Sequence, residues 1–218
     1  MDFRDLGDGR MLRRPAVNLE DLATDATLLR GHFELDERRI AGDHSGVRGE
    51  GSVTRSLLAG TGLAGASLGP VDCTDTVFDG VDLSNSRWSD VTARRVELTG
   101  CRATGWAVSL DRLEDAGFYH CRFDFSVWEC RRSAGIVLFE NCTFRDASFS
   151  GQLDGFVFRN CNFEGIHFDA SSAVGSDLRD SRLQGMRGLI TLRGAQISAD
   201  QLTEVGEILA AEIGITIR

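Results

Sequence analysis

The sequence contains no lysine and only two prolines, Pro15 and Pro70, and no apolar run in it is long enough to cross a membrane. A membrane-spanning helix needs about 20 consecutive apolar residues, so a transmembrane protein is excluded. Residues 1–5 (MDFRD) also lack the basic start and apolar middle of a signal peptide. We therefore expect a cytoplasmic protein that does not act on membranes.

Basic residues are outnumbered by acidic ones. All 24 positive charges are arginines, and the 33 acids give a net charge of −9. Direct binding to nucleic acid or anionic lipid needs clustered positive charge, which disfavours both classes of partner. The expected partner is therefore a neutral or basic protein. The six cysteines include no Cys-x-x-Cys pair, and a cytosolic chain keeps its thiols reduced, so we expect free thiols.

Side chains that could carry catalysis are few and scattered. The four histidines, His32, His44, His120 and His167, share neither spacing nor a common face with a nucleophile or a pair of carboxylates. The sequence therefore predicts a protein that is not an enzyme and that uses no metal or other cofactor.

Glycine is abundant, with 25 residues, and its positions follow a repeat. Apolar residues recur every five positions from Leu58 onward, a period that fits neither a helix nor a flat strand. The first of these centres are Leu63, Leu68, Cys73, Phe78, Leu83 and Trp88, and the series continues to Ile197 with small slips. A small or β-branched residue lies two positions before each centre, and glycine, aspartate or asparagine often ends the quintet. Such residues favour turns, so the chain is expected to bend every five residues.

The cysteines indicate how many bends close one coil. Cys101, Cys121, Cys142 and Cys161 all occupy the small inward position and lie 20, 21 and 19 residues apart. Four quintets therefore make one turn, and residues about 20 apart stack at the ~4.8 Å spacing of neighbouring strands.

The quintets resemble those of the pentapeptide-repeat family, which have the form Ala-(Asp/Asn)-Leu-x-x. Residues 81–85 (VDLSN), 161–165 (CNFEG) and 176–180 (SDLRD) carry the resemblance. It implies an all-β solenoid, a right-handed quadrilateral β-helix. We expect about seven coils within residues 51–197.

The two ends of the chain do not repeat, so we expect them to cap the solenoid. Residues 1–50 are predicted to form an irregular N-terminal cap. Residues 198–218 are predicted to hold a short amphipathic helix and a tail, because a capping-box pattern at residues 198–201 precedes apolar residues at helical spacing. These residues are Leu202, Val205, Leu209 and Ile213. The helix either plugs the last coil or joins two copies into a homodimer, as the resemblance to gyrase-interacting family members implies.

One of the four faces is irregular, because all three slips of the repeat fall on it. That face also places Asp111 and Arg131 in the nominally inward position of adjacent coils, where an unpaired charge is expensive. Either the two side chains pair or the strand bulges outward. The alternative to a purely structural irregularity is a partner-binding site in which Glu114, Asp115 and Arg132 join them.

The resemblance also implies a function, the binding of DNA gyrase as a mimic of duplex DNA that protects the enzyme from quinolone-type poisons. About seven coils at ~4.8 Å give a rod of about 34 Å, and duplex DNA of that length carries about 20 negative charges. Residues 61–197 hold 18 acids and 14 arginines, a net of −4, so the charge match is incomplete. The rival hypothesis is an interaction or scaffold protein with another protein partner. Outward apolar residues Val77, Leu138 and Val157, with Tyr119 nearby, form either a contact patch or scattered surface positions.

Overall fold

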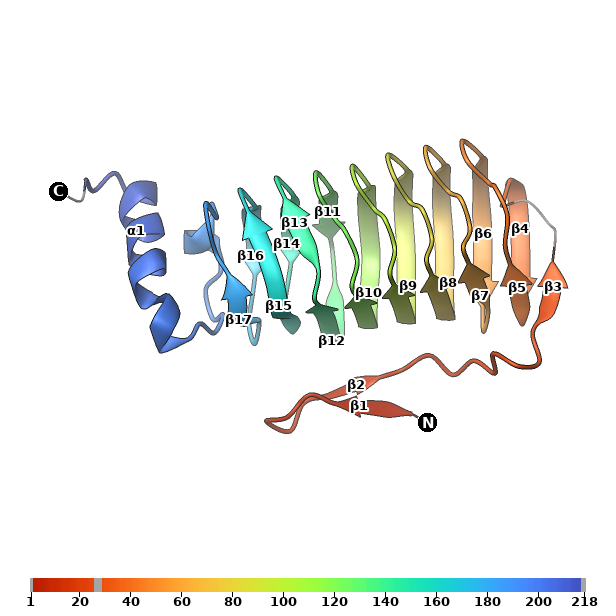
Figure 1. Ribbon diagram of the computed structural model, residues 1–218, viewed down its shortest axis with the longest axis horizontal. Helices are drawn as coiled ribbons and strands as arrows, with labels where there is room; N and C mark the ends of the chain where they lie inside the picture. Colours follow the sequence, from red (N-terminus) through yellow and green to blue (C-terminus); the bar gives the residue numbers. More distant parts are fainter. Residues whose placement is uncertain (1, 26–28, 217–218) are drawn as a thin grey trace.

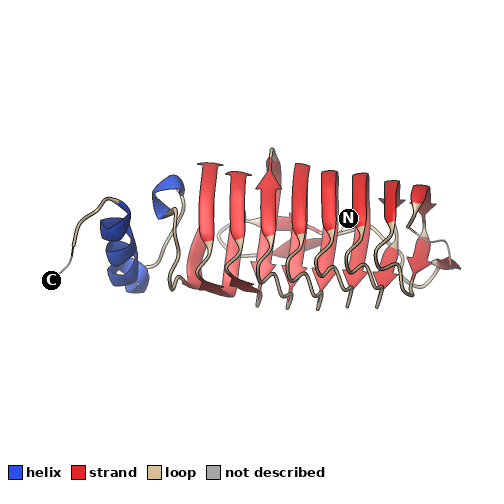
Figure 2. Cartoon of the chain, turned by 90° about the horizontal axis from the view of Figure 1, so that it is seen from above, coloured by secondary structure: helices blue, strands red, loops and turns tan. Residues whose placement is uncertain are grey.

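Short parallel strands wind into a β-solenoid of about eight turns, with one helix at its C-terminal end (Figures 1 and 2). The computed structural model describes residues 2–25 and 29–216. The strands are β1 (Phe3–Asp5), β2 (Met11–Arg13), β3 (Ala23–Asp25), β4 (Gly31–Asp36), β5 (Arg38–Ile40), β6 (Arg48–Thr54), β7 (Leu57–Ala59), β8 (Ser67–Asp79), β9 (Arg87–Thr99), β10 (Ala107–Tyr119), β11 (Val127–Cys130), β12 (Ser133–Glu140), β13 (Thr143–Arg145), β14 (Ser148–Gln152), β15 (Phe156–Glu164), β16 (His167–Ser172) and β17 (Asp177–Arg182). Two 3₁₀ turns, η1 (Leu189–Thr191) and η2 (Ala199–Gln201), precede helix α1 (Leu202–Glu212).

The four-sided coil predicted from the cysteines is confirmed by the strand register. Neighbouring coils pair in parallel with a spacing of 20 residues, as between Val71 and Val91, and the spacing becomes 21 between Phe118 and Phe139. The quintet centres are buried and form one continuous core cluster. Stacked rings dominate its middle, where the centroid of Phe139 lies 4.5 Å from that of Phe118 and 5.0 Å from that of Phe158.

The small inward position has a hydrogen-bonding role that explains its residue types. The Sγ atoms of Cys121 and Cys142 each lie 3.5 Å from a carbonyl oxygen of the preceding coil, and Thr76 Oγ1 donates to the Val53 carbonyl at 2.9 Å. Alanine, serine, threonine and cysteine all fit this space. All six cysteines are free and buried, as expected. Burial raises the pKa of the Cys73 and Cys130 thiols to about 12, so these thiols are not nucleophiles at neutral pH.

The N-terminal region differs from the irregular cap that the sequence predicted for residues 1–50. The solenoid begins earlier, because β4 pairs in parallel with β6, and β5 with β7. The expected boundary at residue 50 therefore falls inside β6, and the additional coil brings the turns to about eight rather than seven. The five-residue repeat is obscured there because Gly49 takes an inward position, where the carbonyl oxygens of Leu29 and Gly31 and the ring of Phe33 leave no room for a side chain.

Residues 2–22, called the arm below, lie outside the coils. Strands β1 and β2 form an antiparallel hairpin, and the arm runs along one side of the solenoid to β3 (Figure 1). Leu6 and Leu12 of the arm are buried against the solenoid.

Helix α1 closes the C-terminal end (Figure 2). The predicted capping box is present, with Ser198 and Gln201 as its two members, and Gly214 ends the helix with a positive φ of 78°. The Glu212 carboxylate accepts hydrogen bonds from the backbone N–H groups of Gly188, Leu189 and Ile190, which fastens the helix to η1. Within the described residues no helix is long and apolar enough to cross a membrane.

Candidate interaction faces

The irregular face resolves the choice between a bulge and an inward pair. Leu110 and Cys130 fill the inward positions of adjacent coils, and the strand register shifts on both sides of Leu110. Asp111 and Arg131 therefore point outward instead of into the core, which corrects the nominal placement. They still pair with each other, because Arg131 donates to Asp111 at 2.7 Å while both side chains stay exposed.

The other three predicted residues of this face lie on the same two coils. Glu114 accepts a 2.8 Å hydrogen bond from Arg112, and Arg132 is exposed. Asp115 is half-buried and accepts from the Ile136 N–H at 3.3 Å. Burial raises the pKa of Asp115, and the charge of Glu114 adds to the effect. The five predicted residues thus lie on two adjacent coils and carry both signs of charge, and Asp111 and Arg131 are the two that contact each other.

The predicted dimer helix divides into two parts. Val205 is buried and Leu209 is half-buried, and both pack on the end of the core. Leu202 and Ile213 are 65% and 59% exposed. The helix therefore plugs the last coil with one part of its apolar face and presents the other part to solvent.

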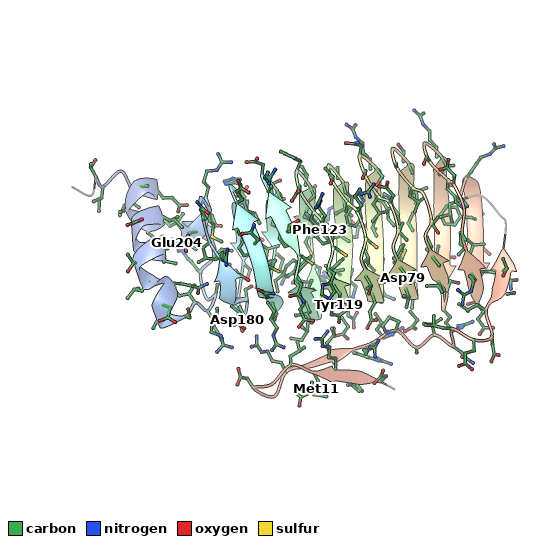
Figure 3. All side chains as sticks on the ribbon, viewed as in Figure 1. Met11, Asp79, Tyr119, Phe123, Asp180 and Glu204 are labelled. Carbon is green, nitrogen blue, oxygen red and sulfur yellow. The ribbon has the colours of Figure 1, made fainter. Side chains whose placement is uncertain are left out.

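Leu138 and Val157, two of the outward apolar residues that the sequence offered as a contact patch or as scattered positions, are covered by the arm. Leu138 and Val157 are 0% and 1% exposed because Leu6 and Leu12 pack on them, together with Tyr119. Figure 3 labels Met11 on the arm and Tyr119 on the facing side of the solenoid. Leu138, Val157 and Tyr119 therefore form one cluster and not scattered positions, but the arm covers this cluster. Val77 lies on the same face and is half-buried.

Acidic residues surround this apolar cluster, and arginines of the arm meet them. Arg4 pairs with Glu140, Arg10 with Asp177 and Arg14 with Glu97, each at 2.7 Å. The solenoid surface under the arm, called the arm face below, is defined by Glu97, Tyr119, Leu138, Glu140, Val157 and Asp177.

Two arm-face residues have shifted pKa values. Burial acts to raise the pKa of Asp177, but the hydrogen bonds from Arg179 and Arg10 outweigh it and lower the pKa to about 2. Burial raises the pKa of Tyr119, whose ring lies 4.9 Å below the Arg4 guanidinium carbon. The ring also covers Gly117, where a Cβ atom would come within 2.5 Å of the tyrosine oxygen.

The sequence contains a signal for the arm that the prediction missed. Gly7-Asp8-Gly9 lies between two short segments that contain both arginine and apolar residues, and glycine and aspartate are typical of a β-hairpin turn. The periodicity search did not detect it, because a hairpin has no five-residue repeat.

A second missed feature is Phe125, which stands at a coil corner. Its φ is 59°, in the left-handed region, and it is 51% exposed. The equivalent corner positions in neighbouring coils hold Gly105 and Asp146.

Val127, also 51% exposed, borders a shallow groove of about 480 Å³ that is lined by small residues such as Ser89 and Ser109 and also by Trp88.

Metal ligands are not clustered in the part of the chain that the structure describes: no three histidines, cysteines or acids lie close enough to hold an ion. His120 and His167 are exposed. His44 is buried, and its Nδ1 accepts a hydrogen bond from the Leu29 N–H at 3.2 Å, which gives it a structural role in the first coils.

Comparison with known proteins agrees with the quintets. The family model described as pentapeptide repeats (8 copies) matches residues 152–185. The chain carries pentapeptide repeats. Parallel pairing at spacings of 19 to 21 residues continues before that segment, back to β6, and isolated bridges at similar spacings follow it as far as Gln196. No curated protein matches the sequence.

The solved structures to which this chain is similar include two of QnrB1, a plasmid-mediated fluoroquinolone resistance protein. A trypsin-treated variant is 16% identical with a TM-score of 0.42, over 89% of this chain and 99% of that one. The full-length protein is 15% identical with a TM-score of 0.33, over 86% and 99%. HetL, a pentapeptide-repeat protein involved in heterocyst differentiation regulation in the cyanobacterium Nostoc, is 12% identical with a TM-score of 0.23, over 78% and 84%.

Proposed function

We propose that this chain is a non-enzymatic, cytoplasmic scaffold protein that binds a protein partner through the flat outer faces of its solenoid. The observation that carries the proposal is the pairing of charges along these faces. Asp82 lies 3.4 Å from Arg102, one coil away, and Asp111 pairs with Arg131 in the same manner. A rigid surface with both signs of charge suits a protein partner better than it imitates the phosphate backbone.

The charge pairs weaken the resemblance to DNA, because the phosphates of a DNA backbone have no covalently attached positive charges beside them. Duplex DNA presents about one negative charge per 1.7 Å. Here arginines stand beside the acids on several outward rows, as also between Arg145 and Glu164 at 3.2 Å. The local field is correspondingly weaker than that of a nucleic acid of equal length.

Binding of DNA gyrase is the second candidate. The overall charge of −9 and the rod of stacked coils favour it, together with the resemblance of the quintets to gyrase-interacting family members. A possible partner-binding site for either candidate is the irregular face with Asp111, Glu114, Asp115, Arg131 and Arg132.

A gyrase supercoiling assay, with and without a quinolone, separates the two candidates. The scaffold proposal predicts neither inhibition nor protection at micromolar protein. Protection or inhibition would favour the gyrase candidate, and it should then weaken in a Glu114→Arg variant but not in a Glu207→Arg control on the exposed side of α1.

When a partner has been identified, amide hydrogen exchange of residues 109–136, measured with and without that partner, tests whether it contacts the irregular face. Protection there supports the irregular face. Unchanged exchange would exclude that face as the binding site.

We also propose that the exposed part of α1 joins two copies. Leu202 and Ile213 are the side chains available for such a contact. Sedimentation equilibrium of the wild type and of a Leu202→Asp, Ile213→Asp variant tests it. A dimer that dissociates in the variant is expected, whereas a wild type that is monomeric at high micromolar concentration contradicts it.

A further inference from the structure

The arm is attached to the solenoid as a separate body. Its hairpin forms a two-stranded sheet of its own, and no strand of it pairs with the 15-stranded sheet of the coils. Most of its attachment is through side chains, with a few main-chain contacts such as Ala16 N to Asp75 at 2.9 Å. A segment held in this way can leave without breaking a ladder of backbone hydrogen bonds.

The surface beneath the arm is unlike the other outward rows of the solenoid. Glu97, Gly117, Leu138, Val157 and Asp177 follow one another in register on five successive coils. Apolar side chains occupy the middle of this row and acids occupy its ends. The corresponding row on the cysteine face is polar instead: it runs through Asp82, Arg102, Arg122, Thr143, Asn162 and Arg182.

The occupant matches this surface in both shape and charge. Leu6 and Leu12 fill the apolar middle, and Arg4, Arg10 and Arg14 reach the acids around it. The acidic side chains are largely sheltered from solvent, with Asp177 8% and Glu97 10% exposed. Sheltered carboxylates that each receive an arginine are selective for a basic strand.

We propose that the arm face is a docking surface for a basic β-hairpin, or an extended basic strand, that carries leucines between arginines, and that the arm is its resident occupant. A partner protein with such a segment binds by displacing the arm. The proposal rests on the protein-binding role above and adds to it a second binding face, the chemistry of the partner that this face takes and a competition that restrains binding.

The test uses the full-length protein and a fluorescein-labelled synthetic peptide of residues 2–16 as the probe. A Leu12→Asp variant undocks the arm, because a carboxylate cannot be buried against Leu138 and Val157. Fluorescence anisotropy should then show at least ten-fold tighter peptide binding to this variant than to the wild type. Met11→Asp is the matched control, since Met11 is the neighbouring residue on the exposed side of β2 and its variant should bind no better than the wild type.

A second variant links the binding to the arm face. Adding Val157→Asp to Leu12→Asp should abolish the gain, and circular dichroism should show the same solenoid in all variants, because Leu12 and Val157 lie outside the main core cluster. No binding to the Leu12→Asp variant at millimolar peptide, or equal binding to all variants, overturns the proposal. This outcome is independent of gyrase, so failure here and failure of the proposed function are distinguishable.

Discussion

Arg10 and Asp177 form an ion pair of 2.7 Å across 167 residues of sequence. Asp177 also accepts a 2.8 Å hydrogen bond from Arg179, and its side chain is almost fully buried beneath the arm. The pair therefore connects the hairpin to one of the last coils. It is one of three ion pairs, with Arg4–Glu140 and Arg14–Glu97, through which arginines of the arm contact the arm face.

Removing Arg10 should loosen the arm. The Arg10→Ala change deletes a charge-assisted hydrogen bond to a sheltered group, which is worth about 1.5–3 kcal/mol, while Arg179 still compensates Asp177. Trypsin should cleave after Arg13 at least about ten-fold faster than in the wild type, because cleavage follows the population of the undocked arm. Arg145→Ala is the control, because Arg145 and Glu164 are both 56% exposed and such pairs contribute little. An unchanged cleavage rate in Arg10→Ala would show that the pair does not hold the arm.

Docking of the arm should depend on acid pH. The pKa of Asp177 is lowered to about 2 in the folded protein, against about 3.9 for an unfolded chain. The ionised carboxylate therefore stabilises the folded protein above about pH 4, and this contribution is lost as the pH falls toward 2; the part of it that comes from the Arg10 hydrogen bond is the part that holds the docked arm. Amide NMR signals of residues 3–13 should shift toward those of an undocked arm over this interval. An Asp177→Asn variant should be partly undocked already at pH 5, and a wild-type arm unchanged at pH 2 would contradict the expectation.

Two phenylalanines should respond to truncation with opposite signs. Phe139 is fully buried between Phe118 and Phe158, so Phe139→Ala should lower the free energy of unfolding by about 3–5 kcal/mol. Phe125 is half-exposed with φ 59°, a conformation that costs a side-chain-bearing residue about 1–2 kcal/mol. Phe125→Gly should therefore leave the stability unchanged or raise it by about 1 kcal/mol. Guanidinium unfolding followed by circular dichroism measures both, and a large loss in Phe125→Gly would reveal packing at that corner.

Glu212 should hold helix α1 in place. Its carboxylate accepts from three backbone N–H groups, two of them from Leu189 and Ile190 at 2.9 and 3.0 Å. Glu212→Gln removes the charge and one acceptor, so the docking of the helix should weaken by about 1–2 kcal/mol. Amide hydrogen exchange of residues 203–212 should accelerate about ten-fold, whereas exchange in a Glu207→Gln control should not change.

The repeat itself was readable from the sequence. A quintet has one inward centre and one small inward position, so its period appears directly in Leu63, Leu68 and Leu83, and the spacing of Cys101 and Cys121 gives the size of the coil. These features could be predicted because each residue contacts the equivalent residue of the next coil, about 20 positions away in sequence. The capping box at Ser198 is local for the same reason, and it too was predicted.

Two features were decided by the tertiary structure alone. Whether Asp111 entered the core depended on a bulge that puts Leu110 inward, and a periodic count cannot place a one-residue shift. Whether Leu138 and Val157 formed a surface depended on Leu6 and Leu12, which are more than 120 residues distant in sequence. The sequence by itself determined the solenoid, because its contacts repeat at a fixed interval. Only the folded chain decided which face is covered, because the arm meets that face through side chains that follow no repeat.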